Sequence, residues 1–328
     1  MIPAMAKREK TFKSFYRNVR RPAEWFLIWL GQAIIPPLSL RGLLRLSRLI
    51  ADTAYIFDCR GKAISAANLR LIFGTRMTPA RERAIIRRAY RNMARVLVNI
   101  FWMSRDTLTR IRDQASFAPG VLETALAHQP AIMVSAHFGN WEIMSQACVA
   151  NGIPVMSVAK TIGSPEMTAR LTALRTTIGQ QIVPAEGAMP HLIRAIKKGA
   201  GIGLLIDQHT NISQGGTWIN FFGVPVSISA APAALSRRFK MPILFVWSRP
   251  LKDGRYRIEP GELFPPDSGL SDTERTQQIV AAFERVIRRH PSFWCLNYRR
   301  WRNILPGDAP ARYPFYARPA REKKKPQR

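Results

Sequence analysis

The pattern of apolar and polar positions predicts strands that alternate with helices through the middle of the chain. Short apolar runs bounded by proline, glycine or polar residues are typical of buried strands. They lie at 131–136, 154–159, 181–184, 203–206, 243–248 and 256–258. Apolar residues at helical spacing predict helices at 79–101, 167–177, 189–198 and 271–289. This alternation predicts an α/β fold, a mixed sheet layered by helices.

The N-terminal region differs, because 25–40 is an uncharged apolar segment preceded by basic residues. It is shorter than the roughly 20 residues that span a hydrocarbon core, and Pro36 and Pro37 interrupt any single helix. We expect a membrane-anchoring helix region, either a short tilted span or helices lying in the membrane interface. A buried helix of a soluble domain remains the alternative.

The same pattern predicts three parts of the chain. Residues 1–50 form the basic N-terminus and the apolar anchor, and 51–305 form the main domain. Residues 306–328 form a basic, proline-rich C-terminal tail, which we expect to be disordered from Arg318 onward.

Charge narrows the function, since 50 Lys and Arg face 21 Asp and Glu, a net charge of +29. Such an excess suggests a polyanionic partner: nucleic acid, an anionic membrane or an acidic carrier protein. Aromatic residues and arginines are mixed at 294–302, a combination that also occurs in nucleic-acid sites. A segment of core aromatics with a basic outer face explains it equally well. No cluster of His, Cys or acidic residues has metal-ligand spacing, so we expect neither metal nor cofactor.

The segment 135–142, SAHFGNWE, contains the most informative candidate chemistry. His137 directly follows a predicted strand, at the end where α/β folds place reactive groups. Glu142 comes five residues later, in the first turn of the next helix, and we expect it to fold back and orient the imidazole. A histidine held by a carboxylate is a general base. Because the chain has no GxSxG motif, the nucleophile is expected to be a hydroxyl of the substrate.

This segment resembles the H-x4-D/E signature of the glycerolipid acyltransferase superfamily. Its exact sequence, AHFGNWE, is similar to that of the bacterial lipid A late acyltransferases, the lauroyl/myristoyl transferase family. Three further blocks follow in the family's order, and the likeness extends over about 119–305. The blocks are 164–179 with an arginine before a glycine, GIGLLIDQ at 201–208, and FFGVP at 221–225.

The resemblance implies a role for each matching residue. His137 would deprotonate the acceptor hydroxyl, and Glu142 would orient the imidazole of His137. Arg175 would bind an anionic group of the substrate, a role that Arg170 on the same helix could share. Asp207 would line the same pocket. In the fourth block, the implied substrate contacts are Phe221 and Gly223, although core packing is the commoner role of such phenylalanines.

We therefore expect a membrane-bound acyltransferase at the cytoplasmic face of a bacterial inner membrane. The resemblance implies transfer of a fatty acyl chain from an acyl-carrier-protein thioester to a hydroxyl of an anionic glycolipid, a lipid A precursor, in lipopolysaccharide biosynthesis. Coenzyme A as donor carrier stays open, as does another glycolipid or phospholipid acceptor. A nucleic-acid-binding protein is the alternative from a different class. It is disfavoured because the basic residues are spread over helices around a strand-end histidine, so no nucleic-acid partner is expected.

Overall fold

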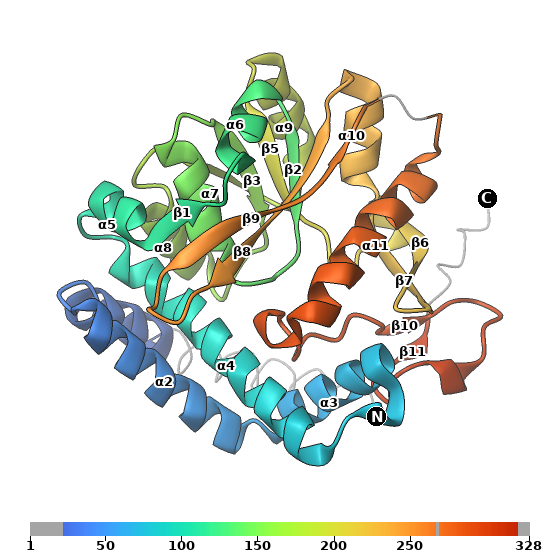
Figure 1. Cartoon of the computed structure of the whole chain (residues 1–328), viewed down its shortest axis with the longest axis horizontal. Coiled ribbons are helices and arrows are strands. Elements are labelled where there is room, and N and C mark those ends of the chain that lie inside the picture. The colour runs from blue at the N-terminus through green and yellow to red at the C-terminus, as the bar shows by residue number, and fades with distance from the viewer. Residues whose placement is uncertain (1–21, 267–268, 321–328) are drawn as a thin grey trace, which may run out of the picture.

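The computed structural model describes residues 22–266 and 269–320. Its core is a seven-stranded sheet with helices on both faces (Figure 1). The strands of this sheet are β1 (Ala115–Phe117), β2 (Ile132–Ser135), β3 (Val155–Ala159), β4 (Gln181–Pro184), β5 (Gly201–Leu205), β8 (Ile243–Pro250) and β9 (Tyr256–Phe264). Their order is β1-β9-β8-β2-β5-β3-β4. The strands from β8 to β4 run parallel, whereas β9 is antiparallel to β8.

Helices cover both faces, so the central strands are buried on both sides. The covering helices are α5 (Thr107–Gln114), α6 (Val121–Ala127), α7 (Trp141–Ala150), α8 (Pro165–Arg175), α9 (Ala188–Lys197), α10 (Ala231–Phe239) and α11 (Asp272–Arg289). In Figure 1, α7 and α8 lie to the left of the sheet and α10 and α11 to its right. Along β2, Ile132 and Val134 share an apolar cluster with Phe283 of α11. Met133, between them, shares the opposite cluster with Cys148 of α7.

The predicted alternation of strands and helices is confirmed. The four predicted helices are α4 (Pro79–Trp102), α8, α9 and α11, and each apolar run predicted as a strand is one. Local signals fix the helix starts: Thr78 caps α4, and Ser271 and Glu274 form a reciprocal capping box on α11. The pattern did not predict the three-residue β1 or the separate hairpin of β6 (Gly216–Phe221) and β7 (Val224–Ser229). Both are too short or too mixed in polarity to show a clear period.

Three N-terminal helices form a layer at one end of the sheet. Figure 1 shows α2 (Leu40–Phe57), α3 (Cys59–Phe73) and α4 below the strands. Residues 22–34 are also helical. Because Leu43 and Ala51 are both buried in α2, the boundary expected at residue 50 cuts through a packed helix. Within the described ranges, no helix combines the length and the apolar character needed to cross a membrane. The basic stretch 7–21 lies outside the described residues.

Within the described residues, the segment predicted to be a C-terminal tail is structured. Residues 306–320 pack against the domain, and β11 (Arg318–Pro319) pairs with β10 (Asn303–Ile304). Tyr316 is buried, and its hydroxyl donates a hydrogen bond to Asn68 of α3. Aromatic residues among the prolines hold this segment in place, which composition alone did not show. Residues 321–328 of the expected tail lie outside the described part.

Candidate active site

The candidate site lies where β2 and β5 end, side by side. These two strands are parallel neighbours, and Ser135 stands opposite Leu205 in their register. Two residues further along each strand come His137 and Asp207. The register therefore places a histidine and an aspartate next to each other at the carboxyl edge of the sheet, where open α/β sheets bind their ligands.

A constrained turn fixes the backbone just after His137. Gly139 has φ +62°, and a Cβ there would lie 1.7 Å from the carbonyl oxygen of Ser248, so only glycine fits. Asn140 then caps α7 with its side chain. From α4, Asn92 donates hydrogen bonds to the carbonyl oxygens of Gly139 and Phe293, at 3.0 and 3.1 Å. The turn is thus fixed by its contacts with β8, α7 and α4.

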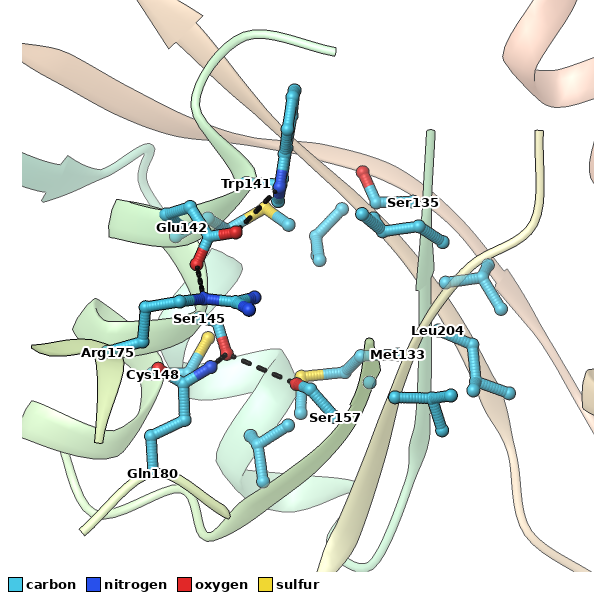
Figure 2. Close-up of a pocket in the computed structure, with 17 residues that line it drawn as sticks. Met133, Ser135, Trp141, Glu142, Ser145, Cys148, Ser157, Arg175, Gln180 and Leu204 are labelled. Carbon is cyan, nitrogen blue, oxygen red and sulfur yellow. Dashed lines mark hydrogen bonds and ion pairs between the residues drawn. The ribbon is translucent and has the colours of Figure 1, made fainter. Parts of the chain in front are cut away.

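Glu142 does not contact His137, which corrects the expectation from its spacing. Its carboxylate accepts hydrogen bonds from Trp141 Nε1 at 2.9 Å and from Arg175 Nε at 2.6 Å (Figure 2). The side chains of Glu142 and Arg175 are about nine-tenths buried. The Trp141 ring packs edge-on against the imidazole, with centroids 4.9 Å apart. The position of Glu142 on α7 directs it to α8 instead of back toward the strand end.

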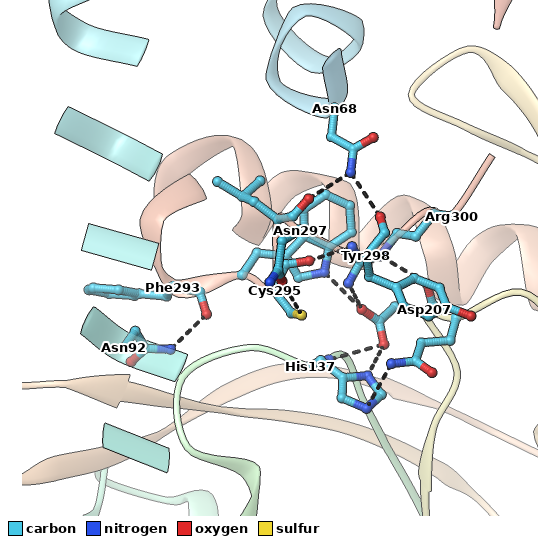
Figure 3. Close-up of polar contacts among 12 residues, drawn as sticks. Asn68, Asn92, His137, Asp207, Phe293, Cys295, Asn297, Tyr298 and Arg300 are labelled. Atoms are coloured by element: carbon cyan, nitrogen blue, oxygen red, sulfur yellow. Dashed lines mark hydrogen bonds and ion pairs between the residues drawn. The ribbon is translucent and has the colours of Figure 1, made fainter. Parts of the chain in front are cut away.

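Asp207 is the carboxylate that holds His137 (Figure 3). Its Oδ1 accepts two hydrogen bonds, from His137 Nδ1 at 2.7 Å and from the backbone N–H of His137 at 3.0 Å. An ionised carboxylate only accepts, so Nδ1 carries the proton and Nε2 is left as an acceptor. The side-chain amide of Gln208 lies 3.2 Å from Nε2 and donates to it. The imidazole is 20% exposed, so part of the ring is accessible from outside.

The second oxygen of Asp207 is held by residues from the C-terminal segment. Oδ2 accepts hydrogen bonds from Trp294 Nε1 at 2.9 Å and Arg300 Nη2 at 2.6 Å. Burial alone would raise the pKa of Asp207. The charges of His137 and Arg300 and their hydrogen bonds outweigh burial and hold the pKa well below its usual range. Asp207 therefore stays ionised, and it orients the imidazole without taking its proton.

The remaining sequence candidates lie away from this pair. Arg170 is exposed and donates from Nε to Gln32, so of the two arginines only Arg175 binds Glu142. Phe221 was expected as a substrate contact, but it is fully buried and stacks on Phe222 in an aromatic cluster, which makes it a core residue. Gly223, with φ +79°, forms the turn of the β6–β7 hairpin.

A cavity opens beside the candidate base. Trp141, which touches His137, also lines this cavity together with Glu142 and Arg175 (Figure 2). Figure 2 shows the Arg175 guanidinium between Glu142 and Ser145. Most of the lining is apolar and comes from the sheet and α7, including Met133, Met144, Val155, Val158 and Leu204. Hydrogen-bonded polar side chains complete it, namely Ser145, Ser157 and Gln180.

Sequence reasoning missed Gln208, Trp294 and Arg300 as parts of the site. Gln208 ends the third sequence block, 201–208, but no role was expected for it. For the other two, the signal was the run of aromatics and arginines at 294–302, and their burial excludes both from any nucleic-acid surface. Burial raises the pKa of the Cys295 thiol to about 11, so this thiol is protonated at ordinary pH. In the described part of the chain, no three His, Cys, Asp or Glu side chains gather in a way that could hold a metal ion.

Two comparisons with known sequences relate this chain to acyltransferases. A phosphatidylinositol mannoside acyltransferase of Mycolicibacterium smegmatis (strain ATCC 700084 / mc(2)155) is 24% identical over 179 residues, 53% of this chain. The chain spans 58% of that relative's length. The profile of the bacterial lipid A biosynthesis acyltransferases matches residues 12–303. Both comparisons place the chain among acyltransferases. It belongs to the bacterial lipid A biosynthesis acyltransferase family, which confirms the resemblance inferred from the four sequence blocks.

Proposed function

We propose that this protein transfers a fatty acyl chain from a thioester to a hydroxyl of a glycolipid, with His137 as general base. The observation that carries the proposal is the pairing of the imidazole: ionised Asp207 accepts from Nδ1–H, which leaves Nε2 as the acceptor nitrogen, where the Gln208 amide donates. A cavity lined mostly by apolar side chains lies alongside. No activated nucleophile of the protein adjoins the base in the described residues, so the attacking oxygen belongs to the substrate.

The reaction then proceeds by direct attack. His137 Nε2 takes the proton of the acceptor hydroxyl as the oxygen attacks the thioester carbonyl. The tetrahedral oxyanion collapses, the carbon–sulfur bond breaks, and the thiolate takes the proton back from the imidazolium. Among the described contacts of Arg175, only Nε is engaged, so its two Nη groups are free to donate to the oxyanion or to another anionic group.

The family favours a lipid A precursor as the acceptor, in lipopolysaccharide biosynthesis. The relative whose name specifies a phosphatidylinositol mannoside supports the second candidate, a different glycolipid acceptor. For the donor we propose an acyl-carrier-protein thioester, because an acidic carrier complements a chain of net charge +29.

Two measurements test these assignments. Mass spectrometry of lipid A from cells with and without the gene should show the loss of one acyl chain, whose mass gives its length. Unchanged lipid A with an altered second glycolipid would transfer the proposal to that acceptor. Purified protein should use the acyl-carrier-protein thioester faster than the coenzyme A thioester of the same chain, and the reverse order would reject the carrier.

We propose that the protein works at the cytoplasmic face of the inner membrane, held in the interface. Helix 22–34 exposes Trp25, Phe26, Leu27 and Trp29 to solvent, at 46–64%. Exposed α2 residues mix large apolar side chains, Leu49 and Phe57 among them, with arginines. Aromatic and apolar side chains mixed with basic ones suit the headgroup region of an anionic bilayer.

Replacing Trp25 and Trp29 together by Glu should weaken membrane attachment. Wild-type protein should stay in the membrane fraction in 1 M salt, because screening reaches only electrostatic attraction, at about 1 kcal/mol per basic residue. Detergent should release it. The double variant should come off with salt, whereas Phe315→Glu, an exposed aromatic in the C-terminal segment, should behave as wild type. Salt release of the wild type would disprove apolar anchoring.

Glu142→Gln should lower transfer by roughly 10²-fold, because Arg175 loses the charge that positions it. Since Glu142 does not touch His137, the acid limb of the pH profile of kcat/KM should keep its position. The measurement is that profile for wild type and variant, with melting temperatures as the folding control. A shifted acid limb would instead show that Glu142 orients the imidazole, as its spacing first suggested.

A further inference from the structure

Arg300 is a fully buried arginine whose hydrogen bonds converge around Asp207 (Figure 3). Nη2 donates to Asp207 Oδ2 at 2.6 Å, and Nε donates to the Asp207 carbonyl oxygen at 3.0 Å. Nη1 donates to the carbonyl oxygen of Cys295. The guanidinium also lies 3.7 Å from the centre of the Trp294 ring. The Arg300 guanidinium thus binds both the side chain and the backbone of Asp207.

This placement has an electrostatic consequence as well as a structural one. His137 binds one oxygen of the carboxylate and Arg300 the other, so the imidazole and the guanidinium share a single negative charge. In a buried site such charges interact strongly. A fixed positive charge at Oδ2 opposes binding of a further proton by the imidazole and the carboxylate.

We propose that Arg300 is a positioning residue that sets the pH at which the His137–Asp207 pair acts as a base. The proposal rests on the proposed function, in which His137 Nε2 accepts the proton of the acceptor. It also explains the aromatic and basic run at 294–302, because this segment carries both donors to Oδ2 into the interior.

Other titratable groups near the pair do not replace this charge. From the C-terminal segment, Cys295 and Tyr298 face it, but burial raises the pKa of both, so they are neutral at ordinary pH. After β5, His209 contacts Asn211 and Asn303, and burial lowers its pKa, so it is neutral as well. The remaining charged or titratable neighbours are bound or lie further out: Glu142 with Arg175, Tyr90 with Asp58, and Lys160 and Arg302, whose charges act on His209.

The test is the pH profile of kcat/KM for purified wild type and Arg300 variants, with a dodecanoyl acyl-carrier-protein thioester and a lipid A precursor. In Arg300→Gln, the acid limb should move up by about one pH unit or more, because a positive charge beside the pair is gone. In Arg300→Lys, kcat should fall, since hydrogen bonds are lost, while the limb stays within about 0.3 unit because the charge remains.

Trp294→Phe is the matched control, because it removes the other donor to Oδ2 and leaves the charge. Its limb should move much less than that of Arg300→Gln. An equal shift would overturn the proposal, as would a lower rate for Arg300→Gln with an unmoved limb. If Arg300→Gln does not fold, the test rests on Arg300→Lys. A shift of a full pH unit in the acid limb of the Arg300→Lys profile would then show that the positive charge is not the cause. Failure of the proposed function looks different: the wild type would transfer no acyl chain, or His137→Ala would match it.

Discussion

His137→Ala should lower acyl transfer by about 10²–10⁴-fold, the usual contribution of a positioned general base. The structure gives the reason at the level of single atoms. Asp207 holds Nδ1–H at 2.7 Å, and Nε2 is the one ring atom left to receive the acceptor proton. Steady-state kinetics with a saturating acyl thioester should show the loss mainly in kcat, because the base acts in the transition state.

The fold should survive this substitution. The imidazole is partly exposed. When the imidazole is removed, Asp207 keeps its hydrogen bonds from Trp294 and Arg300. The melting temperature of His137→Ala should therefore stay within a few degrees of wild type. His209→Ala is the comparison, since His209 is buried two residues beyond Asp207 and contacts Asn211 and Asn303. It should keep its turnover. Equal activity of His137→Ala and wild type would end the general-base mechanism.

The sequence predicted much of the fold because the central strands are buried on both faces. Runs such as 131–136 and 203–206 contain no polar alternation, and the helices between them carry clear caps. The same runs placed His137 and Asp207 at strand ends. What the sequence did not contain was the order of strands, in which β2 and β5 are neighbours although β3 and β4 intervene in the chain. Sheet order is set by packing of whole layers, so the carboxylate beside His137 was assigned to the nearer Glu142.

Long-range contacts explain the other differences. Arg300 reaches Asp207 across 93 positions of sequence, and a basic residue in a charged run gives no sign that it will be fully buried. Likewise Phe221 matches a block of the family, but its ring fills the core beneath Trp294 instead of the substrate site. Residue type and local spacing predicted His137 as the candidate base. The residues that hold Asp207, namely Trp294 and Arg300, lie on the C-terminal segment, which packs against the sheet edge far along the sequence.

Asp207→Asn should be the second severe change, with kcat lower by about 10³–10⁴-fold. An amide at this position can donate to Nδ1, which favours the tautomer with its proton on Nε2, and that tautomer cannot accept the substrate proton. The variant also leaves Arg300 buried without its counter-charge, which costs about 3–5 kcal/mol of folding free energy. Activity and unfolding by urea should both be measured, because the two losses have different causes.

The pH dependence separates the two effects of Asp207→Asn. The folded-state pKa of Asp207 is depressed, so its stabilisation is complete above the unfolded value near 3.8 and is lost as pH falls toward the folded value. The stability gap between wild type and variant should thus be constant from about pH 5 to 8 and narrow only in acid. Asp52→Asn is the matched control, because Asp52 also binds two arginines, but at the surface. This variant should change neither rate nor stability appreciably.

A double variant tests whether Asp207 acts only through His137. Asp207→Asn combined with His137→Ala should transfer acyl chains no more slowly than His137→Ala alone. Additive losses would mean that Asp207 contacts the substrate itself.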